Sequence, residues 1–344
     1  VPWALSAGSG AALRAQAERL RAWLADRPDV DPAAVARTLA SGRAALEHRA
    51  VVAGRTVAEL TERLGAVAEG ASVPASGSGA VFVFPGQGSQ WAGMAAELLD
   101  VSPVFAAAVD ECAAVMDPLT DWSLLDVLRD GSGALLERVD VVQPALFAVM
   151  VGLARWWESC GVRPAAVIGH SQGEIAAAHV AGLLSLEDAA RVVVLRSRAL
   201  RQVSGGGMLS VGVGVERAAE LVEADGRLSL AAVNGPSSVV LSGDTEALAV
   251  VVERCEREGV RARMIPVDYA SHSAHMDAVR DEVAELSASV RPLAGRIAMY
   301  STVTGEVVAD PERLAGSYWF DNLRGTVRLD TAVASAVADG HTLF

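Results

Sequence analysis

Hydrophobic and polar positions along the chain follow two different rhythms, and the first ends near residue 70. Amphipathic, Ala/Arg/Leu-rich segments predict helices at about 11–25, 35–40 and 57–68 and a strand at 48–52. Residues 71–79 are rich in Ser, Pro, Ala and Gly, a composition that predicts a flexible linker. We therefore expect a small separate α/β domain over residues 1–76.

From residue 80 the pattern changes to short apolar strands that alternate with helices. This alternation is typical of a parallel α/β sheet. The runs at 81–84 and 165–168 predict buried strands, and the second opens directly onto a Gly-rich turn and a helix of small residues. We expect a large α/β subdomain with a hydrolase-like core over residues 80–207 and 268–344.

Between these two stretches, residues 208–267 carry a compact pattern of their own. The order of expected elements is strand 208–213, helix 216–224, strands 228–233 and 238–242, helix 245–258 and strand 260–267. That β-α-β-β-α-β order is the split arrangement of ferredoxin-like folds. A subdomain inserted into the core would form one wall of a cleft.

Composition narrows the classes of partner. The chain has 344 residues, 51% of them hydrophobic, a net charge of −13, and no lysine, since all 29 basic residues are arginine. Nucleic acid is not an expected partner, because phosphate neutralisation needs clustered Lys and Arg. Any anionic ligand must bind through local arginines and helix N-termini.

Cysteine usage and hydropathy bear on compartment. Cys112, Cys160 and Cys255 fit neither a metal-binding spacing nor a disulfide framework, which favours a reducing cytoplasm. The longest apolar run, around 144–154, is short for a bilayer span, so no membrane is expected. No signal-peptide pattern opens the chain, and both ends are typical of an excised piece.

A candidate nucleophile lies at the end of the strand at 165–168. Residues 169–173 read GHSQG, which matches the G-x-S-x-G elbow, a sharp strand-to-helix turn that exposes a serine hydroxyl. The helix that follows aims its N-terminal N–H groups at a developing oxyanion. Ser171 is the candidate nucleophile; the alternative is a tight turn whose serine only caps a helix.

A serine nucleophile needs a base, and the chain has six histidines. The run YASHSAH at 269–275 follows an expected strand where the inserted subdomain rejoins the core, a usual position for a catalytic base. Spacing alone does not separate His272 from His275. The alternative is a pair of histidines in a surface loop.

Five segments in order give the chain a family resemblance. They are FPGQGSQW at 84–91, GHSQGE at 169–174, LRS at 195–197, YASHS at 269–273 and YSTVTG at 300–305. The chain resembles the acyltransferase domains of modular type I polyketide synthases, which are related to the malonyl-CoA:acyl carrier protein transacylases of fatty acid synthesis. The first 70 residues resemble the linker domain between ketosynthase and acyltransferase in these megasynthases.

The resemblance implies roles for the catalytic residues. Ser171 would take the acyl group as an ester, and His272 would act as general base and then general acid, while His275 would be a bystander. The backbone N–H groups of Gln87 and Gln172 would form the oxyanion hole.

In the family a main-chain carbonyl orients the imidazole. Here that carbonyl would come from Ser301 or Thr302. Because Asp268 and Asp277 lie near His272 in the sequence, a carboxylate remains the rival orienting group.

Arg196 would bind the substrate. Malonyl-type acyl groups carry a free carboxylate, which a guanidinium can pair with through two hydrogen bonds. Arg191, Arg198 and Arg201 are neighbours, and for any one of these arginines the alternative is a solvated helix face.

The extender unit follows from residues 269–272. In the family, Tyr-Ala-Ser-His at these positions accompanies methylmalonyl, and His-Ala-Phe-His accompanies malonyl. Ser271 in place of Phe leaves room for the 2-methyl branch, and Tyr269, Ala270 and Gln172 belong to the same selectivity group. Because one methyl group contributes only about 1–3 kcal/mol, we expect a preference for (2S)-methylmalonyl with malonyl or ethylmalonyl as minor substrates.

The expected reaction is a ping-pong transfer from a CoA thioester to Ser171 and then to the phosphopantetheine thiol of an acyl carrier protein, in polyketide chain extension. Expected partners are methylmalonyl-CoA, the carrier protein and an adjoining ketosynthase domain, with no metal and no permanently bound cofactor. Two alternatives remain: a serine hydrolase such as a thioesterase, and a catalytically silent scaffold module.

Overall fold

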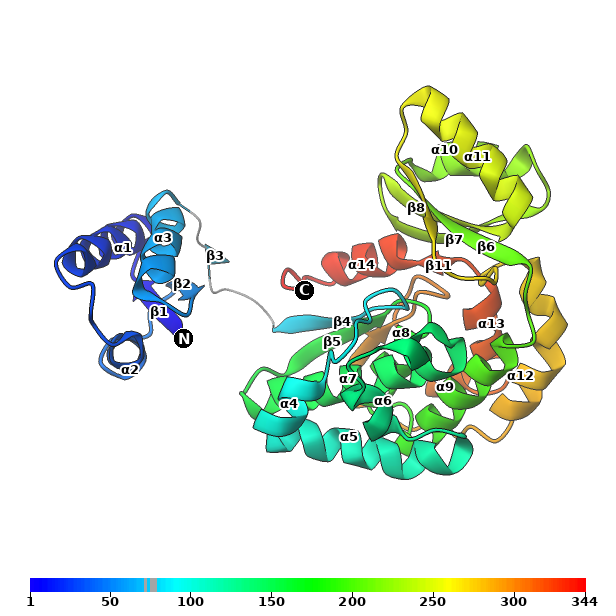
Figure 1. The fold of residues 1–344 in the computed structure, drawn as a ribbon, viewed down its shortest axis with the longest axis horizontal. Coiled ribbons are helices and arrows are strands. Elements are labelled where there is room, and N and C mark those ends of the chain that lie inside the picture. The colour runs from blue at the N-terminus through cyan, green and yellow to red at the C-terminus, as the bar shows by residue number, and fades with distance from the viewer. Residues whose placement is uncertain (71–72, 75–78) are drawn as a thin grey trace. The chain divides into compact units, whose positions relative to one another are not determined.

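The computed structural model describes residues 1–70, 73–74 and 79–344, and the chain divides into two compact units, Val1–Gly77 and Ser78–Phe344 (Figure 1). The first unit contains β1 (Pro2–Ala7), α1 (Gly10–Ala25), α2 (Pro32–Ser41), β2 (His48–Ala53), α3 (Val57–Ala68) and β3 (Val73–Pro74). The strands form an antiparallel sheet in the order β1-β2-β3.

The helices of the first unit lie where the hydrophobic pattern predicts them, but β1 and β3 are not predicted. β3 falls inside the expected linker, of which residues 71–72 and 75–78 lie outside the described residues. In β1, Trp3 and Leu5 are buried on one face of the strand and pack with Leu13, Leu60 and Leu64 of the helices. This alternation gives the small unit its own core.

The large subdomain of the second unit is built on a three-stranded parallel sheet, in the order β10-β5-β4. Its strands are β4 (Ala80–Phe84), β5 (Pro164–Gly169) and β10 (Ala298–Tyr300). Its helices are α4 (Ala96–Val101), α5 (Pro103–Met116), α6 (Leu124–Arg129), α7 (Val139–Ser159), α8 (Gly173–Val180), α9 (Leu186–Leu200), α12 (Arg280–Ser287), α13 (Tyr318–Arg324) and α14 (Leu329–Ala338). Short 3₁₀ segments, η1 (Asp117–Leu119), η2 (Ala134–Glu137), η3 (Ala274–Val279) and η4 (Pro311–Leu314), connect them.

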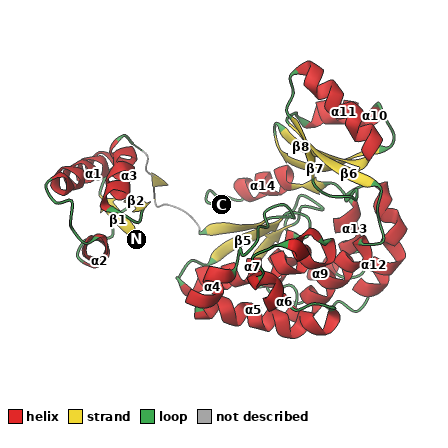
Figure 2. Ribbon diagram, in the orientation of Figure 1, coloured by secondary structure: helices red, strands yellow, loops and turns green. Residues whose placement is uncertain are grey.

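Both faces of this sheet are covered, as a parallel sheet requires (Figure 2). Val167 points into the main core with the helices that include α5, α7 and α9, whereas its neighbours Ala166 and Ile168 pack against Ala332 and Ala336 of α14. The carboxyl ends of the strands are therefore the free edge at which a site can form.

Helix α7 is longer than the apolar run in the sequence indicates. It has 21 residues and is long and apolar enough to cross a membrane, so the expectation that this segment is too short was wrong. However, 83% of its apolar window is buried inside the protein, where α7 contacts α5 and α9. Its hydrophobicity is accounted for by its place at the centre of the core.

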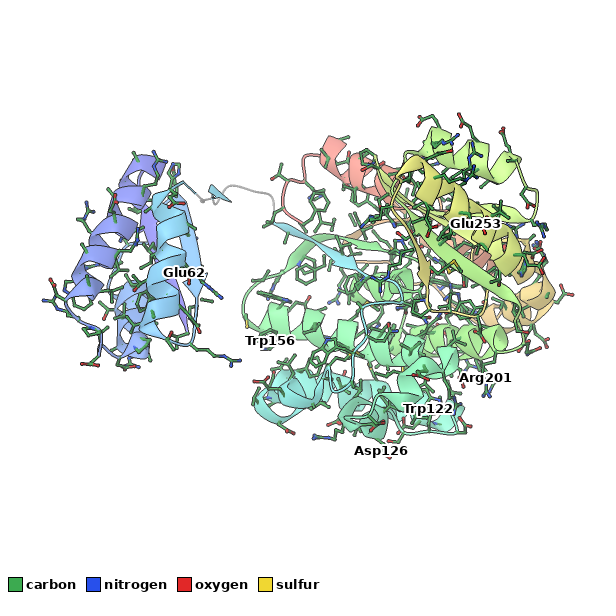
Figure 3. All side chains as sticks on the ribbon, turned by 45° about the horizontal axis from the view of Figure 1, so that its top comes forward. Glu62, Trp122, Asp126, Trp156, Arg201 and Glu253 are labelled. Carbon is green, nitrogen blue, oxygen red and sulfur yellow. The ribbon has the colours of Figure 1, made fainter. Side chains whose placement is uncertain are left out.

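The small subdomain has the expected ferredoxin-like order. It comprises β6 (Gly206–Val211), α10 (Val215–Glu223), β7 (Leu228–Gly235), β8 (Ser238–Asp244), α11 (Thr245–Glu258) and β9 (Ala262–Ile265). Its helices cover one face of the antiparallel sheet, and Glu253 of α11 is exposed to solvent (Figure 3). A fifth strand, β11 (Val327–Arg328), comes from later in the chain and pairs parallel with β7.

Candidate active site

Ser171 stands on the turn between β5 and α8. Its backbone has a φ of 53°, in the left-handed region that residues other than glycine rarely adopt. Gly169 and Gly173 make the turn possible. A Cβ at Gly169 would lie 2.1 Å from Glu174 Cα, and a Cβ at Gly173 would lie 2.3 Å from the carbonyl oxygen of Phe84. The turn is therefore the strained elbow that the sequence motif predicts.

His272 contacts Ser171 directly. The distance from Ser171 Oγ to His272 Nε2 is 2.8 Å, and His272 Nδ1 lies 2.8 Å from the carbonyl oxygen of Gly325. Because a carbonyl oxygen only accepts, Nδ1 carries the proton, which leaves Nε2 free to accept the hydrogen of the serine hydroxyl. The backbone N–H of His272 also donates to the carbonyl of Leu323, at 3.0 Å.

The carbonyl that orients the imidazole is not the expected one. Gly325 takes the place expected for Ser301 or Thr302, whose carbonyl oxygens instead accept the backbone N–H groups of Gly305 and Arg328. The rival carboxylates are excluded as well. Asp277 pairs with Arg280 and Arg324, and among the described residues neither Asp268 nor Asp277 bonds the ring of His272.

Burial sets the protonation state of His272. Removal from water lowers the pKa of its imidazole to about 3, and the nearby charge of Arg196 acts in the same direction. The ring is therefore neutral at pH 7, the form in which it can take a proton from Ser171.

Two backbone N–H groups are free at the positions expected for an oxyanion hole. Among the described residues, neither the N–H of Gln87 nor that of Gln172 donates an intramolecular hydrogen bond. The side chain of Gln87 has a separate role, since its Oε1 accepts from the hydroxyl of Tyr269 at 2.7 Å and from Nε2 of Gln143 at 3.3 Å. Together these bonds fix the loop after β4 to Tyr269 and to Gln143 of α7.

Arg196 is buried on α9, and only 2% of it is exposed. One nitrogen, Nη1, donates to Gln143 Oε1 at 3.2 Å, whereas Nε is buried without a partner, and no carboxylate pairs with the guanidinium in the described part of the chain. Burial lowers the pKa of Arg196 to about 10. A buried, incompletely satisfied cation of this kind is suited to receive an anionic group.

A cavity of about 300 Å³ brings most of the expected site residues together. Its lining includes Gln87, Ser171, Gln172, Tyr269, Ser271 and His272. The helix-free face of the small sheet, with Met208 and Asn234, forms the opposite wall. Two expected residues do not line it: Ala270 packs against Gly206, and Arg196 reaches the cavity only through Gln143.

Three other histidines of the second unit have hydrogen-bond partners away from Ser171. His275 Nε2 lies 2.9 Å from Asp244 Oδ1, and His170 Nε2 lies 2.9 Å from Asn234 Oδ1 across the cavity wall. His179 bonds the carbonyl of Leu184. In the part of the chain that the structure describes, no group of three or more His, Cys, Asp or Glu side chains could hold a metal ion.

Sequence reasoning did not single out Gln143, Glu174 or Asn322. All three are buried polar side chains. Gln143 interrupts an apolar stretch of α7, and Glu174 precedes a run of small apolar residues in α8, so a polar residue within an apolar pattern was the available signal. Asn322 carries no comparable signal.

With this geometry, comparison with known proteins decides the family. A family model described as "Acyl transferase domain" matches residues 81–344. The chain belongs to this acyltransferase family. A second model, described as "RhiE-like, KS-MAT linker domain", matches residues 4–71. The resemblance stated from the sequence motifs is confirmed.

The relatives of this acyltransferase are modular polyketide synthases. The whole chain is 54% identical to part of the spectinabilin polyketide synthase system protein NorA' of Streptomyces orinoci and 50% identical to part of erythronolide synthase EryA2 of Saccharopolyspora erythraea. It spans about a tenth of the length of these proteins, 10% in each case.

Solved structures agree in fold. The acyltransferase domain from module 8 of the salinomycin polyketide synthase is 50% identical, with a TM-score of 0.87 over 99% of this chain and 83% of that one. The malonyl CoA-acyl carrier protein transacylase of Coxiella burnetii is 27% identical, with a TM-score of 0.71 over 77% of this chain and 85% of that one. The expected fold class is confirmed.

Proposed function

We propose that this acyltransferase loads an extender unit, methylmalonyl, from coenzyme A onto Ser171 and passes it to the phosphopantetheine thiol of an acyl carrier protein. The observation that carries the proposal is the 2.8 Å hydrogen bond between Ser171 Oγ and His272 Nε2 at the start of α8. A serine hydroxyl bonded to a neutral imidazole is the arrangement that nucleophilic acyl transfer requires.

The first half-reaction forms the acyl-enzyme. Ser171 Oγ attacks the thioester carbonyl while His272 Nε2 takes the hydroxyl proton. The N–H groups of Gln87 and Gln172 stabilise the negative charge on the carbonyl oxygen. When the tetrahedral intermediate collapses, the carbon–sulfur bond breaks and His272 returns the proton to the leaving CoA thiolate.

The second half-reaction is the reverse with a new thiol. The phosphopantetheine thiol gives its proton to His272 and attacks the ester carbon. The ester carbon–oxygen bond then breaks, and Ser171 recovers its proton from His272. No permanently bound cofactor is required, because the same two side chains handle the proton in both directions.

Transfer of a carboxylated acyl group is supported by Arg196. Its buried guanidinium donates to Gln143 and has an unpartnered Nε. It can therefore pair with the free carboxylate of a malonyl-type group. The hydrolase alternative is disfavoured, because a carbonyl rather than a carboxylate orients His272. The scaffold alternative is disfavoured because the hydrogen-bonded pair is intact.

Choice of methylmalonyl over malonyl rests on Ser271. This residue is buried and lines the cavity, whereas the hydroxyl of Tyr269 is held by Gln87 and fixes the neighbouring wall. A serine there leaves volume for the 2-methyl group, at a discrimination of about 1–3 kcal/mol. Further parts of the proposal are the carrier protein and an adjoining ketosynthase domain as partners, and a cytoplasmic location.

The test is intact-protein mass spectrometry after the chain is mixed with equal malonyl-, methylmalonyl- and ethylmalonyl-CoA, with Ser171→Ala as the control. We expect a methylmalonyl adduct on the parent and none on the variant. A malonyl adduct would retain the reaction and overturn the assignment of Ser271. A folded chain that gains no adduct would overturn the transferase proposal.

A further inference from the structure

Glu174 is a fully buried carboxylate three residues after the candidate nucleophile, in the first turn of α8. Burying a carboxylate costs free energy unless hydrogen-bond donors surround it. The donors around Glu174 therefore indicate its role. Its oxygens accept from Tyr318, Asn322 and Thr302, which come from two segments far from α8 in the sequence. None of these contacts belongs to the acyl-transfer chemistry itself.

The first set of contacts runs through α13. Asn322 Nδ2 donates to Glu174 Oε2 at 2.7 Å and to the carbonyl oxygen of Ser171 at 3.2 Å. The residue after Asn322 supplies the Leu323 carbonyl that accepts the backbone N–H of His272, and Gly325, at the end of the helix, supplies the carbonyl that holds Nδ1. One amide side chain therefore joins Glu174, the nucleophile and the helix that orients the base.

The second set of contacts runs through the loop after β10. The backbone N–H of Thr302 donates to Glu174 Oε1 at 3.2 Å, and the Thr302 hydroxyl donates to the carbonyl oxygen of Gly169 at 2.8 Å. Tyr318, at the start of α13, donates its hydroxyl to Glu174 Oε1 at 2.7 Å. Glu174 is thus bonded to the segments that flank the elbow on both sides.

We propose that Glu174 is a positioning residue: it holds the elbow, the loop after β10 and α13 in one arrangement, so that Ser171 Oγ and His272 Nε2 stay within hydrogen-bond distance. Both members of the pair depend on it. Ser171 is held through Asn322, and His272 is held through the α13 carbonyls of Leu323 and Gly325. Small errors in such a distance lower reaction rates strongly, because the reacting atoms must meet in a narrow range of geometries.

Glutamine is a sharp probe of this role. The N–H of Thr302 and Nδ2 of Asn322 can only donate, and they meet different oxygens of Glu174. A glutamine has the same shape, but its NH₂ group must face one of these donors. Glu174→Gln therefore keeps the packing and breaks one contact.

The inference rests on the proposed function only in that Ser171 and His272 act together, so its main readout uses no acyl-CoA. Phenylmethanesulfonyl fluoride sulfonylates an activated serine and releases fluoride. We expect Glu174→Gln to react at Ser171 about 10–100-fold more slowly than the parent, with the same final fraction labelled. That final fraction reports how much protein is folded, whereas the rate reports the pair. In acyl transfer we expect kcat to fall by the same factor, with KM changed less than about 3-fold.

Two tyrosines supply a matched comparison. Tyr318 donates to Glu174 at 2.7 Å, and the hydroxyl of Tyr300 donates at the same distance to Asp339, which follows α14. Tyr318→Phe should slow the reaction at Ser171 at least about 3-fold, which corresponds to the loss of roughly one hydrogen bond. Tyr300→Phe should react at the parent rate. Equal rates for the two phenylalanine variants, or a parent rate for Glu174→Gln, would overturn the proposal.

Thr302 keeps the proposal testable if Glu174→Gln does not fold. Thr302→Val removes the hydroxyl that bonds Gly169 and keeps the shape, and Thr302→Ser restores it. A slow valine variant that serine rescues supports the proposal, and identical rates overturn it. If the parent labels with the sulfonyl fluoride but forms no acyl adduct, the proposed function fails while the positioning role of Glu174 is still measured.

Discussion

Ser171 and His272 lie 101 positions apart in the chain, yet their side chains are hydrogen-bonded and both have a left-handed backbone, with φ angles of 53° and 61°. They are the two non-glycine residues with positive φ among those the structure describes. Such a conformation costs about 1–3 kcal/mol at each residue and persists only where the surroundings enforce it. The protein therefore stores backbone strain at both members of the pair.

Replacing His272 and His275 in turn should show which of the two histidines is the base. We expect His272→Ala to lower the rate of Ser171 acylation by about 10²–10⁴-fold, because the serine loses the group that takes its proton. His275→Ala is the matched control, since His275 pairs with Asp244 and should leave the rate within a factor of about 2. Acylation reactions quenched at intervals and analysed by mass spectrometry give the rates of both variants. A large loss of rate in His275→Ala would contradict the assignment of His272 as the base.

Arg196→Ala should slow acylation by carboxylated substrates far more than acylation by uncharged ones. A hydrogen bond to a charged group contributes about 1.5–3 kcal/mol, so loss of one such bond predicts a fall of roughly 10–150-fold in kcat/KM for malonyl-type CoA esters. Acylation by acetyl-CoA should fall far less or rise. Arg198→Ala, on the exposed side of the same helix, should change neither rate. A similar loss with acetyl-CoA would point to a structural effect instead.

Ser271→Phe should move the preference from methylmalonyl toward malonyl. The phenyl ring fills the part of the cavity beside the acyl group on Ser171. We expect the ratio of kcat/KM for methylmalonyl-CoA to that for malonyl-CoA to fall about 10-fold or more, the range for one methyl group. Ser271→Ala should keep the parent preference, since it removes a hydroxyl and adds no volume. Competition between the two CoA esters, read by mass spectrometry, measures the ratio directly.

Acylation should persist in mild acid. The pKa of His272 is lowered to about 3, so the neutral base remains available well below the ordinary histidine value of about 6.5. We expect the rate to stay level between about pH 8 and about pH 5.

Fold stability should depend on the same pKa shift. Because the unfolded chain binds this proton more tightly, His272 lowers the free energy of unfolding as the pH falls from about 6.5 toward 3, and has no such effect above about 6.5. If the rate of acylation began to fall already near pH 6.5 as the pH is lowered, that result would contradict the low pKa of His272.

The order of elements was predictable because the hydrophobic period changes along the chain. Helix α11 begins at Thr245 and ends at Glu258, as the pattern predicts, and the ferredoxin-like order is correct. β3 and β11 were not predictable, because each has two residues and carries no period. The length of α7 was underestimated because Pro144 in its first turns resembles a helix boundary.

The site was predictable as far as its residues lie in motifs. Ser171 stands between glycines that the turn requires, whereas the choice between His272 and His275 needed the resemblance and is now supported by the contact with Ser171. The prediction of which carbonyl orients His272 was wrong. Every residue has a backbone carbonyl, so no pattern of side chains in the sequence marks Gly325 for this role. Arg196 differs from Arg198 only in helical phase, which a mostly apolar helix leaves ambiguous.

Strand β11 has a practical consequence for protein engineering. Two residues after Gly325, the chain joins the sheet of the small subdomain at Val327, beside β7. The carbonyl that fixes the base is thus anchored next to the insertion, so a minimised enzyme made by trimming out residues 208–267 would lose the neighbour that holds this segment. Removal of the small subdomain would therefore lower activity. Redesign of the side chains on the same sheet that face the cavity would leave the pairing of β11 with β7 in place.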